Sequence, residues 1–124
     1  MKTNKEIQAE ARQLMVLGGQ FQNDQRIAGL SGTVETASRV LVNLPTNLAT
    51  PGRERHVEAV MAGDALVYRL MERETDLSAS ARGERDEAGA LLASSDSAYD
   101  VLRTGYDLAE EERLGAELEC YAER

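Results

Sequence analysis

Paired carboxylates are the side chains of this sequence whose spacing could support chemistry. Glu84 and Glu87 lie three residues apart, and Asp96 and Asp100 lie four apart. Acids at this spacing on the inner faces of helices can hold Mg²⁺ in helical nucleotide hydrolases. However, Glu84 and Glu87 precede the first large apolar residue of their predicted helix, where acids favour the helix dipole, and Asp96 projects outward. The pairs therefore do not predict a catalytic metal site.

A second candidate is an acid inside an apolar pattern. Asp64 interrupts the apolar residues of segment 51–74, where an acid is costly without a partner. If residues 51–106 fold as an αα-hairpin, Asp64 faces Ser94 or Ser95, and we interpret the pair as a polar layer that fixes helix register. Two alternatives remain open: Asp64 caps a restarted helix, or Asp64, Ser95 and the nearby His56 form a ligand or metal site.

Other catalytic patterns are weaker. Cys120 projects away from the apolar stripe of its predicted helix, and His56, the only histidine, lies 64 residues upstream. The glycine pairs at 18–19 and within 29–32 lack a phosphate-loop pattern. No metal ligands follow at the usual spacing, so the sequence predicts no catalytic residues, no metal and no cofactor.

The elements that would position these residues are predicted to be helices, because apolar residues recur at spacings of three and four. Thr3 and Glu6 form a capping box for the first helix, which ends at Gly18-Gly19. Further helices are expected over about 27–44, 51–74 and 88–106, and from Asp107 onward. The predicted fold class is an all-α antiparallel bundle of four to five helices around the long αα-hairpin at about 51–106, in one domain spanning 1–124. Because the apolar stripes of its helices are similarly spaced, two chains could also pair as a homodimer.

Charge is distributed unevenly between the two halves of the chain. The net charge is −8; residues 1–62 hold six acids and seven Lys or Arg, while residues 63–124 hold sixteen acids and seven Arg. The halves thus carry +1 and −9. An acidic half disfavours contact with nucleic acid or anionic lipid and favours a basic partner.

Apolar content and the single cysteine bear on where the protein acts. The longest apolar runs are too short to span a bilayer, and the N-terminus lacks the apolar region of a secretory signal. One cysteine cannot form an internal disulfide, which fits a reducing compartment. We therefore expect a cytoplasmic protein.

The sequence favours a non-enzymatic acidic binding protein, an inhibitor or adaptor that occupies a basic, nucleic-acid-binding surface of a partner protein. In size and charge the chain resembles small phage anti-defence proteins such as anti-CRISPR proteins, which implies a nucleic-acid mimic. Alternatives are a small-ligand-binding protein or metal-dependent hydrolase using the intra-bundle acidic site, and a structural oligomerising protein. The predicted partner-binding residues are the acids of the last helix: Glu110, Glu111, Glu112, Glu117 and Glu119.

Overall fold

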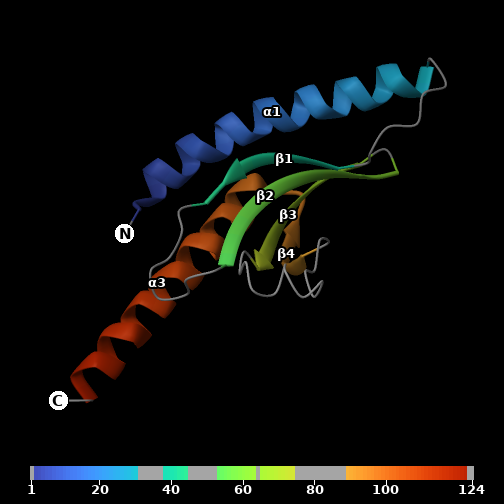
Figure 1. Cartoon of the computed structure of the whole chain (residues 1–124). Helices are drawn as coiled ribbons and strands as arrows, with labels where there is room; N and C mark the ends of the chain where they lie inside the picture. The colour runs from blue at the N-terminus through green and yellow to red at the C-terminus, as the bar shows by residue number, and fades with distance from the viewer. Residues whose placement is uncertain (1, 31–37, 45–52, 64, 75–88, 123–124) are drawn as a thin grey trace, which may run out of the picture.

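The protein is an α+β structure, not the predicted all-α bundle. The computed structural model describes residues 2–30, 38–44, 53–63, 65–74 and 89–122. Within these ranges, four antiparallel strands lie in the order β1-β2-β3-β4, and two long helices flank them in sequence (Figure 1). In chain order the elements are α1 (Asn4–Leu30), β1 (Ser38–Asn43), β2 (Arg53–Ala62), β3 (Ala65–Glu74), β4 (Ala90–Ser95) and α3 (Ala98–Ala122).

The predicted third helix, 51–74, is instead the hairpin of β2 and β3. Ala62 pairs with Ala65, so only residues 63 and 64 connect the strands. Gly63 has φ +65°, a conformation that glycine adopts without steric cost. Gly-Asp between two runs rich in β-branched and aromatic residues is a hairpin signal. It is more specific than the spacing of three and four between apolar residues, which also fits a helix. The αα-hairpin prediction is therefore wrong, and with it the seams proposed for a homodimer.

Other predicted helix boundaries are also displaced. α1 continues through Gly18-Gly19, because burial of Gly18 and Phe21 against the sheet outweighs the low helix propensity of glycine. The predicted helix over 27–44 is divided between the end of α1 and β1, and the one over 88–106 between β4 and α3. α3 has no break at Asp107. The predicted connections at 45–52 and 76–83 lie outside the described residues.

Both helices cover the same face of the sheet. α1 lies over β1 and β2, and α3 lies over β3 and β4 (Figure 1). Alternation along β2 and β3 turns Val57, Tyr68 and Leu70 toward the helices. The remaining buried members of this core, which α1 and α3 supply, are Ile7, Ala11, Leu14, Ala98, Val101 and Leu102. The core is thus a single layer between the sheet and the helix pair.

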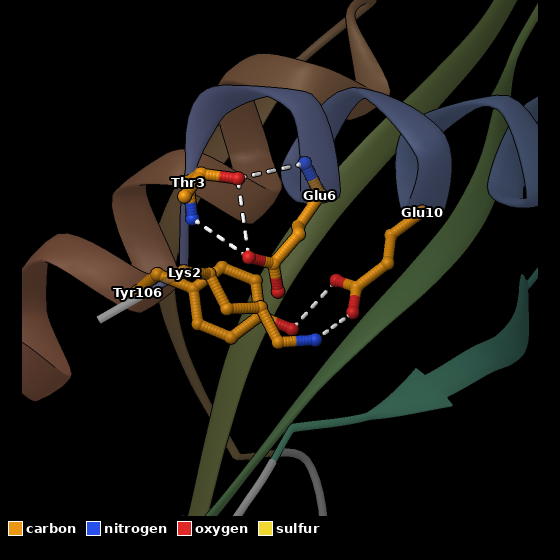
Figure 2. A network of polar contacts seen from close by, with 5 residues as sticks. All are labelled: Lys2, Thr3, Glu6, Glu10 and Tyr106. Carbon is orange, nitrogen blue, oxygen red and sulfur yellow. Dashed lines mark hydrogen bonds and ion pairs between the residues drawn. The ribbon is translucent and has the colours of Figure 1, made fainter.

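A polar network ties the start of α1 to α3 (Figure 2). The predicted capping box is confirmed: the Glu6 amide donates to Thr3 Oγ1 at 3.3 Å, and Thr3 Oγ1 donates to Glu6 Oε1 at 3.1 Å. One turn later, Glu10 forms an ion pair with Lys2 and accepts a hydrogen bond from the Tyr106 hydroxyl at 2.6 Å. Lys2 Nζ also lies 5.1 Å from the centre of the Tyr106 ring.

The network shifts the pKa values of its members. Burial raises the pKa of Glu10, but the hydrogen bonds from Lys2 and Tyr106 outweigh burial and leave the pKa below its ordinary value of 4.5. The hydrogen bond to Glu10 raises the pKa of Lys2. Burial, with donation to Glu10, raises the pKa of Tyr106. The ionised form of Glu10 is therefore favoured by folding.

A matched pair of glycines tests the packing of α1 on the sheet. A Cβ at position 18 would lie 2.7 Å from the Tyr68 hydroxyl, whereas a Cβ at Gly19 meets no atom within 4 Å. We expect Gly18→Ala to lower the free energy of unfolding by about 1–3 kcal/mol through overpacking. Gly19→Ala should raise it by about 0.5–1 kcal/mol, because alanine favours the helix. Urea denaturation measures both, and equal effects would contradict this packing.

The second prediction concerns pH. Because folding lowers the pKa of Glu10, its ionised carboxylate stabilises the protein above pH 4.5, and this contribution is lost as pH falls through the lower folded-state pKa. Glu10→Gln should therefore cost about 1 kcal/mol at pH 7 and little near pH 3. Glu6→Gln, which can keep its capping hydrogen bond, is the control. Urea denaturation at several pH values measures the difference, and a cost of Glu10→Gln that persists at pH 3 would contradict the assignment.

Candidate functional site: a partner-binding surface

The structure describes two of the three residues predicted for a polar layer or ligand site, Ser95 and His56. Ser95 pairs with Tyr68, so it lies on the helix-covered side of the sheet, where its Oγ accepts a hydrogen bond from the Ser97 amide at 3.0 Å. His56 alternates with the buried Val57 and lies on the opposite face. Asp64 lies outside the described residues. Strand alternation therefore separates His56 from Ser95.

The face of the sheet away from the helices carries a neutralised charge cluster. Glu58, only 9% exposed, accepts hydrogen bonds from Arg69 Nε and Nη2 at 3.1 and 2.6 Å. His56 Nε2 lies 3.5 Å from the second Glu58 oxygen. Both guanidinium nitrogens of Arg69 donate to the same oxygen, Oε1, and these charge-assisted hydrogen bonds hold the buried carboxylate in place. No group of three possible metal ligands occurs among the described residues.

A second charge cluster, on the helix-covered face, joins three elements where α3 leaves the sheet. Arg55 of β2 donates to Glu72 of β3 at 2.9 Å and forms an ion pair with Glu112 of α3. The side chains of Arg55 and Glu72 are 12% and 11% exposed. Burial alone would lower the pKa of Arg55, but the hydrogen bonds to Glu112 and Glu72 raise it above its ordinary value. We call these three residues the Arg55 cluster.

α3 carries the largest share of the acids in the described structure. It holds seven acids and two arginines, for a net charge of −5, whereas α1 holds three of each. Up to residue 115, where burial is described, its last buried side chain is Leu102, followed by the buried Gly105. Its C-terminal half continues past the ends of the strands (Figure 1). We call the segment from residue 107 to 122 the acidic arm. Its acids are Asp107, Glu110, Glu111, Glu112, Glu117 and Glu119.

The predicted partner-binding acids have different environments on this arm. Arg113 Nε donates to Glu110 at 3.2 Å, and this contact lowers the pKa of Glu110. Glu112 belongs to the Arg55 cluster. Glu111 is exposed. Glu117 and Glu119 lie in the helix, but their side chains are outside the described part of the structure. The arm therefore presents acid to solvent while one of its acids anchors it.

Sequence reasoning missed the basic partners on the strands. The helical interpretation predicted no acidic partner for Arg55 or Arg69, so both contributed only to the net charge. Strand pairing places Arg55 opposite Glu72 and Arg69 opposite Glu58. Opposite charges at matched positions of two adjacent runs were the signal that could have revealed both pairs.

Comparison with known proteins finds no matching family model, no matching curated protein and no matching solved structure. Among the described residues, neither helix is both long and apolar enough to cross a membrane. The support for a function therefore comes from the geometry and charge of this chain.

The Arg55 cluster generates a prediction for the arm. Arg55→Met leaves Glu72 and Glu112 close together without their cation, and we expect it to cost about 3 kcal/mol of unfolding free energy at pH 7. Arg103→Met, which removes an exposed i,i+4 contact with Asp107, is the control and should cost under about 0.5 kcal/mol. Hydrogen exchange should also quicken in residues 106–115 of the Arg55 variant alone. Unchanged exchange there would show that the cluster does not anchor the arm.

Proposed function

We propose that the protein acts without catalysis, by binding a basic partner protein through the acidic arm of α3. The single observation that carries this proposal is the concentration of negative charge on a helical segment that continues past the sheet. An exposed helix with acids on several sides can enter a groove or lie on a flat surface. Proteins with basic grooves usually hold nucleic acid there, so the expected action is that of an inhibitor or adaptor that occupies such a surface in the cytoplasm.

Electrostatics favours a basic partner over an acidic or neutral one. From Glu110 to Glu119 the arm places five acids within about 14 Å of helix axis, using the rise of an α-helix. One arginine, Arg113, lies within the same stretch, so pairing inside the helix cannot neutralise it. Such a field raises the rate of encounter with cationic surfaces and repels phosphate backbones. This charge distribution resembles that of a nucleic acid more than that of an average protein surface.

The enzyme alternative gains no support from the described residues. Its proposed ligands His56 and Ser95 lie on opposite faces of the sheet. An open groove of about 460 Å³ lies between α1 and the β2–β3 turn, and the described residues that line it, none of them a carboxylate, are Gln22, Gln25, Arg26, Met61 and Gly63. A binding function is the better supported reading of this structure.

Charge reversal on the arm tests the proposal. Glu111→Lys with Glu119→Lys changes the net charge by +4, and we expect it to weaken partner binding at least about tenfold. Asp24→Lys with Asp96→Lys makes the same change elsewhere and should alter binding by less than about threefold. Partners are first captured on immobilised wild-type protein from lysate of the producing cells at low salt, identified, purified and measured by calorimetry.

Three outcomes would contradict the proposal. The first is the absence of any basic partner at low salt. The second is an equal effect of the two double variants, which would reflect net charge alone rather than the arm. The third is a complex that survives about 0.5 M salt, where electrostatic reach falls to a few ångströms. Displacement of the arm by added DNA would further identify the occupied surface as a nucleic-acid site.

A further inference from the structure

One side of α1 carries cations that no acid of the fold neutralises. Among the lysines and arginines whose side chains the structure describes, every one pairs with an acid except Lys5, Arg12 and Arg26. These three are exposed, and Arg26 donates to the Asn23 side chain at 2.8 Å. They lie seven and fourteen residues apart in one helix, so they form a single stripe about 32 Å long.

The acids of α1 do not offset this charge. Glu6, Glu10 and Asp24 each bond to a side chain within the fold. At 100° per residue, all three lie about 120° or more around the helix from Arg12. Beside Arg12 lie two apolar side chains, Met15 and Val16, which are 59% and 62% exposed. We define the α1 stripe as the five residues Lys5, Arg12, Met15, Val16 and Arg26.

The rest of the same chain leaves the α1 stripe uncovered. The buried residues of α1, which face the sheet and α3, lie on a different side of the helix. The acidic arm of the same chain cannot fold back onto the stripe, because Arg55 holds Glu112 at the sheet and the arm continues away from α1 (Figure 1). An occupant of the stripe must therefore come from another molecule.

Charge and apolar character together favour the acidic arm of a second copy as this occupant. On the arm Glu111 is exposed and pairs with no cation among the described residues, and Leu114, three residues later, is 46% exposed. Arg12 and Met15 have the same three-residue spacing of charge and apolar side chain on α1. Two helices packed side by side can therefore pair Glu111 with Arg12 and Leu114 with Met15.

Other anionic occupants fit the α1 stripe less well. A phosphate backbone offers charge but no apolar partner for Met15 and Val16. A membrane of anionic lipid offers both, but its extended negative surface repels the whole chain, whose net charge is −8. The arm, in contrast, carries its acids beyond the sheet, so it can reach the stripe of another copy while the two sheets stay apart (Figure 1).

We propose that the α1 stripe binds the acidic arm of a second copy of this chain. Lys5, Arg12 and Arg26 face acids of the arm, and Met15 and Val16 face Leu114. The contact joins two different surfaces, so it is of the head-to-tail type. Because the same arm is proposed to bind a basic partner, self-association would compete with that binding; this consequence alone rests on the proposed function.

Sedimentation equilibrium of the purified protein tests the contact. A contact along one helix is small, so we expect weak association over micromolar to submillimolar concentrations. The average mass should rise above 13.6 kDa with concentration at low salt. It should return to that value at about 0.5 M salt, where electrostatic reach falls to a few ångströms. Circular dichroism checks that each variant below is folded.

A charge exchange identifies the two surfaces. The stripe variant, Lys5→Glu with Arg12→Glu, and the arm variant, Glu111→Lys with Glu119→Lys, should each raise the dissociation constant at least about tenfold, since each makes the two surfaces alike in charge. An equimolar mixture should restore it to within about threefold of the wild type. Both variants keep a net negative charge, so association confined to the mixture cannot result from net charge.

Four outcomes would overturn the proposal. These are a wild type that stays monomeric at low salt, a stripe variant that associates like the wild type, a mixture that stays monomeric, and association that persists unchanged at about 0.5 M salt. Binding of a monomeric wild type, but not of the stripe variant, to vesicles of anionic lipid would assign the stripe to a membrane surface instead. None of these measurements involves a basic partner, so a failure here is distinguishable from a failure of the proposed function.

Discussion

Burial of one face of the β2–β3 hairpin is the constraint on which the other features of this structure depend. Val57, Tyr68 and Leu70 point to the same side, and an isolated hairpin cannot cover them. α1 and α3 both pack on that side. Once they do, the fold leaves the arm exposed, whereas on the opposite face of the sheet Glu58 and Met71 are still buried. The position of the arm thus follows from the packing of both helices on one side.

The same constraint explains why Arg55 is buried at the boundary of the core. Position 55 lies on the helix-covered face, near the end of the sheet where α3 continues outward. An arginine there can pack its aliphatic stem against the core and place its guanidinium between carboxylates of a strand and a helix. Burying one of these charges alone would be costly, so the cluster stabilises the orientation in which α3 continues past the sheet. Six residues before Glu112 on α3, Tyr106 contacts Glu10 and Lys2, and these side chains hold the start of α1 on α3.

The sequence reveals some elements of this fold more clearly than others. The capping box at Thr3 and Glu6 was predictable because its two side chains act within one turn. The strands were not recognised because the apolar residues at 57, 61, 68 and 71 recur at helical spacing, whereas strand alternation puts 68 and 71 on opposite faces. In the structure Val57 and Tyr68 face the helices, whereas Met71 pairs with His56 on the other side. The Gly-Asp turn at 63–64 was the local feature that distinguished the two interpretations.

The residues of the candidate site also differ in how far the sequence predicts them. The acids of the last helix could be located from sequence, because a charge count and an apolar stripe are properties of one segment. The ion pairs of Arg55 and Glu58 could not be predicted in this way, because their partners lie on the neighbouring strand and become neighbours only when the hairpin forms. That difference also bears on which residues can change independently of the fold. A change at the exposed Glu111 would alter the charge of the arm without disturbing the core, whereas changes at the Arg55 cluster would alter both. Because Glu111 lies outside the packed layer, the charge of the arm can vary while the fold that presents it stays the same.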